Sequence, residues 1–200
     1  MPCYSIESVV PVVDPSAYVH PTAVLIGDVI VGANCYVGPC ASLRGDLGSI
    51  VLKAGANVQD TCVMHGYPGA ATVVEENGHV GHGAVLHGCV VRHDAIVGMN
   101  AVVMDEAEIG EQSMVAACAF VRAGTTVPGR SLVAGIPAKV LRKLTDDEVA
   151  RKLQGTLTYQ DLTRRCLASM LEVRPLTKVE ANRPRVGAAD LKPLVAVKRS

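Results

Sequence analysis

The chain has little aromatic content: it contains no Trp, one Phe and five Tyr in 200 residues. Large aromatic side chains therefore cannot dominate the core of the single domain that this length allows. Apolar residues still make up 49% of the chain, and many of them are small or β-branched. Because such residues fit strands well, we expect a mainly β fold with a core of small side chains.

The chain also lacks an excess of charge, because 19 basic residues are balanced by 19 acidic ones. This balance argues against the basic surface typical of proteins that bind nucleic acids or anionic membranes. No run of 18 uncharged apolar residues is present, and no basic stretch near the start precedes an apolar one. We therefore expect a soluble, cytoplasmic protein that binds neither nucleic acid nor a membrane.

Cysteine pairs are missing as well. None of the seven cysteines forms a CxxC motif, and their number is odd, whereas a secreted disulfide framework typically has an even number. We expect reduced thiols that act as small apolar fillers in a cytoplasmic protein.

An aliphatic residue recurs at every sixth position in two long runs. The positions are Val19, Leu25, Val31, Val37 and Leu43, then Val91, Val97, Val103, Ile109, Val115, Val121, Val127 and Val133. A period of six does not match the 3.6-residue period of an amphipathic helix. It predicts short strands joined by tight corners, with glycines such as Gly98 and Gly110 supplying the corner conformations. Three units would form one coil of a parallel β-helix.

The six-residue spacing is irregular over 43–52, 64–80 and 86–91. The surplus in the second interval falls in Gly66–Ala71, which is rich in turn residues and should bulge outward. Irregularities in a regular scaffold tend to mark functional sites. All three intervals lie beside or within a region that contains His65, His82 and His87.

The repeat ends near residue 139, and a helix is predicted beyond it. Thr145 and Glu148 have the spacing of a capping box, and apolar residues including Leu153 and Leu157 continue to about Val173. We expect a β-helix domain over 1–143, a helix packed on it over 144–173, and an extended or partly disordered tail over 174–200.

The three histidines suggest a metal centre, because catalytic zinc sites use three protein ligands and leave a fourth position open. Counting six-residue units places His65 and His87 one coil apart, so they should stack about 4.8 Å from each other. The same count places His82 on a different face. The third ligand would then come from a neighbouring subunit, which favours a cyclic trimer. His20 and His93 are more simply surface residues, and His79 is ambiguous.

Most of the chain resembles the γ-class carbonic anhydrase family of hexapeptide-repeat proteins. The resemblance is carried by Arg44-Gly45-Asp46, Asn57-Val58-Gln59-Asp60, the three histidines and Gly135-Ile136-Pro137-Ala138-Lys139. Further segments, among them His20–Asp28 and Tyr159-Gln160, are similar to the phenylacetic acid degradation (PaaY) branch, with the carnitine-operon (CaiE) branch a near relative. The resemblance implies a left-handed parallel β-helix and a homotrimer with metal sites between subunits.

The resemblance also implies roles for individual residues. His65 and His87 would bind Zn (Fe or Co being possible) from one subunit and His82 from the next. Gln59 would orient the metal-bound hydroxide, Arg44 and Asp46 would form an ion pair at the subunit contact, and Asp60 would support the ligands. Asn57 belongs to the same motif or is only a corner residue. Tyr159 could orient a substrate or a water if its helix folds over a neighbouring subunit.

The chain departs from the family in the parts that serve rapid CO₂ hydration. Leu47 stands where the fast enzymes have Glu, and Gly66–Ala71 replaces their acidic loop. Leu47 and Tyr67 would instead form an apolar rim that suits an acyl group.

The sequence therefore predicts a metal-dependent hydrolase of acyl-CoA thioesters in phenylacetic acid catabolism, acting through a metal-bound hydroxide. Three alternatives stay open. They are a γ-type carbonic anhydrase that acts on CO₂ and bicarbonate, a metal-free hexapeptide acyltransferase with one His as general base, and a non-catalytic trimer held by metal.

Overall fold

The aliphatic residues of the repeat point into a narrow core that runs through a stack of short strands. One row of this core places Leu25, Leu43, Met64, Leu86, Val103 and Val121 side by side on neighbouring strands. All of these side chains are fully buried. Because burying a side chain of this size contributes about 1.5–3 kcal/mol, each row holds successive coils together.

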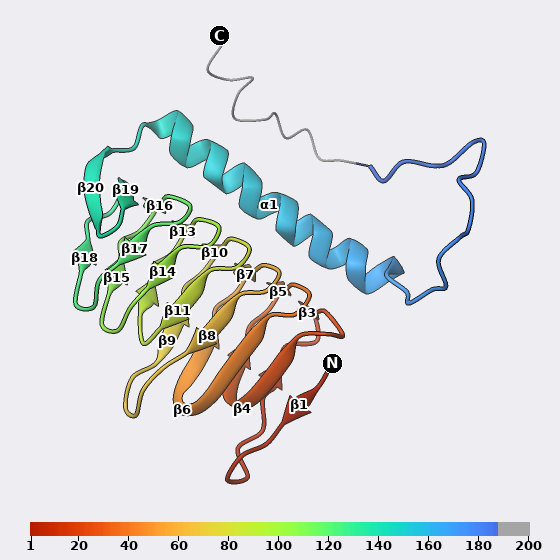
Figure 1. Ribbon diagram of the computed structural model, residues 1–200, viewed down its shortest axis with the longest axis horizontal. Helices are drawn as coiled ribbons and strands as arrows, with labels where there is room; N and C mark the ends of the chain where they lie inside the picture. The colour runs from red at the N-terminus through yellow and green to blue at the C-terminus, as the bar shows by residue number, and fades with distance from the viewer. Residues whose placement is uncertain (188–200) are drawn as a thin grey trace.

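The computed structural model describes residues 1–187, whose strands form two sheets that wrap one core (Figure 1). The larger sheet contains β1 (Cys3–Tyr4), β2 (Val12–Val13), β4 (Val24–Val31), β6 (Ser42–Leu52), β8 (Val63–His65), β9 (Thr72–Val74), β11 (Val85–His87), β12 (Val90–Val91), β14 (Val102–Val103), β15 (Glu108–Ile109), β17 (Phe120–Val121) and β18 (Thr126–Val127). The second sheet contains β3 (Tyr18–Val19), β5 (Tyr36–Val37), β7 (Asn57–Val58), β10 (His79–Val80), β13 (Ile96–Val97), β16 (Met114–Val115), β19 (Ser131–Gly135) and β20 (Ala138–Lys143). All pairs within the sheets are parallel except β19 with β20, so the predicted parallel β-helix is confirmed. Its handedness stays an expectation.

The first irregular interval of the repeat is a long bent strand and not a loop. β6 runs over eleven residues, and its two ends pair with different strands, β8 and β9. The strand therefore turns a corner of the coil, and its pairing with β4 is interrupted there between Gly45 and Ile50. Its middle lies beside the end of β8, where His65 is found.

Two glycines of the repeat, Gly98 and Gly110, have another purpose than the one predicted. Gly98 and Gly110 do not adopt left-handed φ angles, whereas Asn77 and Asn100 at the corners do, as Asn tolerates well. A Cβ on Gly98 would lie 2.5 Å from the backbone nitrogen of Ala117 in the next coil. Glycine is required there because adjacent coils approach closely.

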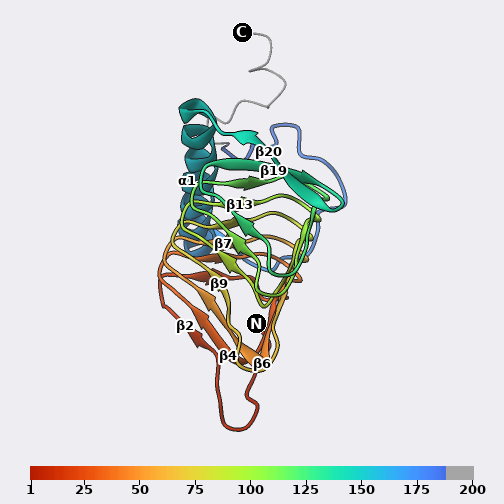
Figure 2. The ribbon, with the colours of Figure 1, turned by 90° about the vertical axis from the view of Figure 1, so that its left-hand side faces the viewer.

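The helix α1 (Asp146–Ser169) lies along the stack, beginning beside β20 and reaching the N-terminal coils (Figures 1 and 2). It contacts β3, β5 and β7 of the second sheet. The predicted capping box is confirmed: the Glu148 amide donates to the Thr145 hydroxyl, and the Thr145 amide donates to the Glu148 carboxylate. The helix ends at Ser169 and not at Val173, because Met170 is already extended.

Of the leucines of α1, Leu162 packs against the sheet, but others face solvent. The buried residues are Lys152, Thr156, Thr163 and Cys166, whereas Leu153 and Leu157 are 42% and 46% exposed. Hydroxyl and thiol groups thus cover the sheet together with Tyr159 and Leu162.

The tail contains no helix or strand over residues 174–187. The rest of the predicted tail, residues 188–200, lies outside the described residues. Within residues 1–187, no helix has both the length and the apolar character needed to cross a bilayer.

Candidate functional site

His65 and His87 end two adjacent strands and face the same side of the β-helix. Strands β8 and β11 pair in register, and His87 is the direct neighbour of His65, as the repeat count predicts. Nδ1 of His65 lies 3.2 Å from Nε2 of His87. The ring centroids are 5.1 Å apart.

Each of these two rings has its other nitrogen on a carboxylate. Nε2 of His65 lies 3.0 Å from Oδ1 of Asp46, and Nδ1 of His87 is hydrogen-bonded to Asp105. When each carboxylate accepts an N–H, the two remaining nitrogens, Nδ1 of His65 and Nε2 of His87, each carry a lone pair. These two lone pairs face each other. A carboxylate behind the histidine is the usual support of a metal ligand, since it fixes the ring and raises its basicity. The pair therefore has the donor set of half a metal site.

Asp46 is itself held by Arg44, whose guanidinium donates to Oδ2 at 2.7 Å. This hydrogen bond from Arg44 lowers the pKa of Asp46 below its ordinary value, and the contact with His65 acts in the same direction. Asp46 therefore stays ionised and can accept from His65. The predicted Arg44–Asp46 ion pair is present, and within one chain it supports a histidine.

His82 lies at a different corner. It comes after β10 and before β11, whereas His87 ends β11, so the two corners border one face of the β-helix. Nδ1 of His82 lies 3.1 Å from Oδ2 of Asp60, and its side chain is 44% exposed. No group of three metal-ligating residues forms anywhere within residues 1–187 of a single chain.

Gln59 and Asn57 are placed on the side of His82 and not on that of His65. Both side chains are buried, and the Gln59 amide donates to Asn57 Oδ1 at 3.1 Å. Each amide also contacts the ring of His79. The site residues thus fall into two groups, the His65–His87 corner (with Arg44, Asp46 and Asp105) and the His82 corner (with Asn57, Gln59, Asp60 and His79).

Tyr159 packs on its own chain, because α1 folds back over the sheet to which it is connected. Its ring meets those of Tyr36 and His79 edge-on, with centroids 5.3 and 5.4 Å away. Burial raises the pKa of Tyr159 to about 12, so its hydroxyl stays protonated. Tyr159 therefore belongs with the His82 corner of the same chain.

Leu47 and Tyr67 lie close to the His65–His87 corner but do not form one rim. Leu47 is 53% exposed and lines a hollow of about 320 Å³ with Gly48 and Ala70. Tyr67 turns away over Gly88, and its hydroxyl donates to Glu106 at 2.9 Å. Of Leu47 and Tyr67, it is Leu47 that lines this hollow.

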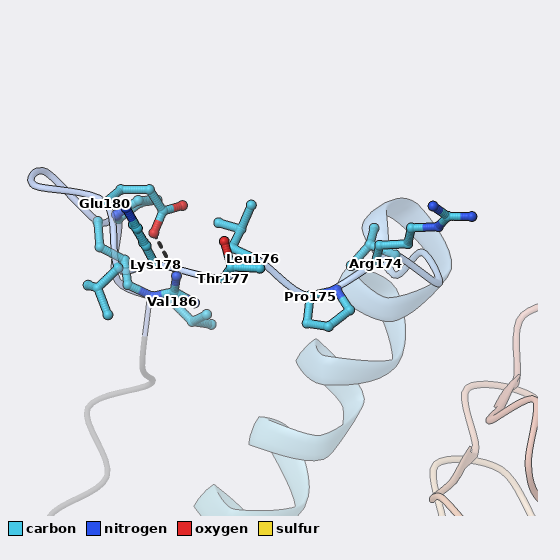
Figure 3. Close-up of a pocket in the computed structure, with 11 residues that line it drawn as sticks. Arg174, Pro175, Leu176, Thr177, Lys178, Glu180 and Val186 are labelled. Carbon is cyan, nitrogen blue, oxygen red and sulfur yellow. Dashed lines mark hydrogen bonds and ion pairs between the residues drawn. The ribbon is translucent and has the colours of Figure 1, made fainter.

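Another hollow, of about 680 Å³, lies elsewhere. It is formed by residues 173–186 of the tail, which curl around an ion pair between Glu180 and Arg183 (Figure 3). Its lining residues such as Val179 and Val186 are about four-fifths exposed. None of the predicted site residues lines it.

Sequence reasoning missed three residues of these corners. Asp105 holds His87, Thr72 donates to the His65 carbonyl and accepts from the Gly88 amide, and His79 contacts Gln59. A signal existed for Asp105, which lies one 18-residue coil beyond His87. None existed for Thr72, because the irregular loop before it breaks the count.

No family model matches the chain. The carnitine operon protein CaiE of Salmonella agona is 58% identical over 194 residues, which is 96% of this chain and 98% of that protein. A putative acetyltransferase of Bacillus cereus has a similar structure, with a TM-score of 0.82 and 30% identity, over 83% of this chain and 96% of the other. A hexapeptide transferase family protein of Anaplasma phagocytophilum also has a similar structure, with a TM-score of 0.79 and 35% identity, over 82% of this chain and 97% of the other.

Proposed function

The chain belongs to the family of the carnitine operon protein CaiE, a family of hexapeptide-repeat proteins, and we propose that it is an enzyme that acts on acyl-CoA thioesters. Two of the similar solved structures are named as a putative acetyltransferase and a hexapeptide transferase, which supports acyl chemistry. The finer proposal is hydrolysis at a metal centre of the PaaY type.

The observation that carries this proposal is the facing pair of His65 and His87, each backed by a carboxylate. The pair would hold a cation through Nδ1 of His65 and Nε2 of His87. Nε2 of His82 from an adjacent subunit would supply the third ligand, because His82 is exposed and already oriented by Asp60. Imidazole nitrogens suit zinc, iron and cobalt. When bound, such an ion would polarise the thioester carbonyl as a Lewis acid.

A trimer would bring the two corners together. They border the face formed by β8, β11 and β14, so three chains that turn this face inward would place the His82 corner of each beside the His65–His87 corner of the next. The outward side chains of the face are aliphatic: Val63, Val85 and Val102 are aligned across these strands, and Val63 is 40% exposed. Burying such a row favours association.

The other residues have supporting roles in this proposal. Asp46, Asp60 and Asp105 fix the three imidazole rings, and Arg44 keeps Asp46 ionised. Gln59, next to Asn57, would orient the attacking water across the subunit contact. Leu47 would contact the acyl group, and Tyr159 would shield the His82 corner from solvent.

Metal content gives the first test. We expect about one equivalent of zinc, iron or cobalt per subunit in purified protein, and loss of most of it in His82→Ala. The matched control is His93→Ala, because His93 is also exposed and also lies beside a carboxylate, Asp94 at 3.2 Å. Full retention of metal in His82→Ala would contradict a shared site.

Substrate assays on the same metal-loaded sample test the reaction. A panel with phenylacetyl-CoA, carnitinyl-CoA and acetyl-CoA should release CoA without an acceptor, and a chelator should stop the release. Release that requires an acceptor and resists the chelator would overturn hydrolysis in favour of acyl transfer. That second function is favoured by the names of the two similar structures. CO₂ hydration faster than thioester cleavage would instead indicate a carbonic anhydrase.

A further inference from the structure

His79 is a partly buried histidine that takes no part in the proposed donor set. It lies on β10 with its ring outside the core, where α1 covers it and Tyr159 meets it edge-on. Burial lowers the pKa of His79 to about 3, and the nearby positive charge of Lys152 adds to this effect. The ring is therefore neutral at physiological pH, with one nitrogen that can accept a hydrogen bond.

Polar atoms of His79, Gln59 and Asn57 lie within hydrogen-bond distance of one another. Nε2 of Gln59 lies 2.6 Å from Nε2 of His79 and donates to Oδ1 of Asn57 at 3.1 Å. Nδ2 of Asn57 lies 3.2 Å from Nδ1 of His79, but this contact is not a hydrogen bond: when Nε2 of the neutral ring accepts from Gln59, Nδ1 carries the hydrogen and cannot accept from Asn57. A carboxamide has two N–H groups, so His79 and Asn57 together use both hydrogens of the Gln59 amide.

The oxygen of Gln59 is the part of this side chain that stays free. It has no hydrogen-bond partner in the part of the chain that the structure describes. Among the described residues, Oδ1 of Asp94 is the one side-chain oxygen or nitrogen that is both fully buried and without a partner. Because the Gln59 oxygen also has no partner, it is not fully buried. Gln59 thus presents an acceptor to its surroundings while its amide nitrogen is held from behind.

Asn57 and His79 lie in a row of otherwise apolar or aromatic residues, where burying polar side chains for packing alone would be energetically unfavourable. Asn57 and His79 align with Tyr36 on one side and with Ile96 and Met114 on the other. Burying an amide and an imidazole in such a row is unfavourable unless they satisfy one another. Apolar residues would pack there at lower cost.

We propose that His79 is a positioning residue that fixes the direction of the Gln59 carboxamide, so that its oxygen accepts a hydrogen bond from the reacting water. This inference rests on the proposed function, because it assigns a purpose to the orientation of Gln59. It extends the site from the two corners to the layer beneath α1. The chain of contact runs from Tyr159 to His79, then to Gln59.

The first test uses metal-free protein and needs no activity. His79→Phe keeps a ring against Tyr159 but cannot accept from Gln59. In protein labelled with ¹⁵N in glutamine side chains, we expect the Gln59 NH₂ signals to move, while those of Gln112 and Gln154 stay. The Gln59 signals are identified by their absence in Gln59→Leu. Unchanged Gln59 signals in His79→Phe would overturn the proposal.

The second test separates positioning from folding. In His79→Phe we expect kcat for thioester hydrolysis to fall about tenfold to a hundredfold, with KM and metal content within about twofold of the unmodified protein. His79→Gln should recover part of the loss, because its carbonyl can accept from Gln59. The matched control is Thr163→Val, which alters another buried polar group beneath α1 and should leave kcat unchanged.

The outcomes distinguish this inference from the proposed function. Equal loss of kcat in Thr163→Val, or no recovery in His79→Gln, would reduce His79 to a packing residue and overturn the inference. Moved Gln59 signals with unchanged kcat would also overturn it. Absence of thioester hydrolysis in the unmodified, metal-loaded protein would contradict the proposed function, while the signals of Gln59 would still report whether His79 holds it.

Discussion

Carboxylates next to histidines occur at several places in this chain, and their geometry separates a site from a surface pair. His93 contacts Asp94, its neighbour in sequence. His65 and His87 face each other, and their carboxylates come from β6 and from the corner after β14. Two imidazoles whose lone pairs converge would repel each other unless a proton or a cation lies between them.

Gly88 is the residue on which the His87 side of this arrangement depends. Its φ is +56°, and a Cβ there would lie 2.7 Å from Oδ1 of Asp105 and 2.7 Å from the ring of Tyr67. We expect Gly88→Ala to displace Asp105, weaken metal binding and lower the free energy of unfolding by about 1–3 kcal/mol. Urea denaturation at one protein concentration and metal analysis measure both effects.

Gly155 provides the matched control for this substitution. A Cβ there meets nothing within 4 Å, and the residue lies inside α1. Gly155→Ala should therefore raise the free energy of unfolding by about 0.5–1 kcal/mol. If Gly88→Ala were as stable as the unmodified protein and kept its metal, the close contact around Gly88 would not matter for the site.

At the scale of elements, α1 links the C-terminal end of the β-helix to the His82 corner. The helix starts after β20 at one end of the stack and carries Tyr159 to the ring of His79. Its packed side contains Lys152, whose ammonium donates to the Asn77 carbonyl at 2.7 Å. Because the contacts of this side are polar as well as apolar, the position of α1 along the sheet is fixed.

The capping box is expected to set how firmly α1 begins. Thr145→Ala removes the hydroxyl that accepts from the Glu148 amide, and we expect the free energy of unfolding to fall by about 1 kcal/mol. Thr158→Ala is the control, because that hydroxyl only donates to the Gln154 carbonyl on an exposed turn. A loss in Thr158→Ala equal to that in Thr145→Ala would argue against the cap.

At the scale of the whole molecule, the two corners are separated by one face of the β-helix. Because His82 precedes β11, His87 ends it, and the core side of this strand is filled by Leu86, no rearrangement of side chains within one chain can join the corners. The proposed centre is therefore complete only between chains.

Mixing two defective chains tests this division. His65→Ala and His82→Ala should each lack the centre alone. In trimers assembled at random from equal amounts of both, about a quarter of the contacts would pair an intact His65 with an intact His82. We expect metal content and thioester hydrolysis to return to about that fraction in co-expressed protein. No recovery would contradict a site shared between subunits, and mixing His65→Ala with His87→Ala, which share a corner, is the control that should recover nothing.

The sequence by itself determined the β-helix, because Val, Leu and Ile at every sixth position can be buried together only by stacked coils. It also determined the alignment of His65 with His87, since the two residues lie one coil apart. The same holds for the start of α1, which Thr145 caps. The tertiary structure alone decided which groups support the histidines: Asp46 reaches His65 because β6 bends around a corner, and Tyr159 meets His79 because α1 folds back over its own sheet. The repeat period encodes neither the bend nor the path of the helix, because contacts between segments distant in sequence set both.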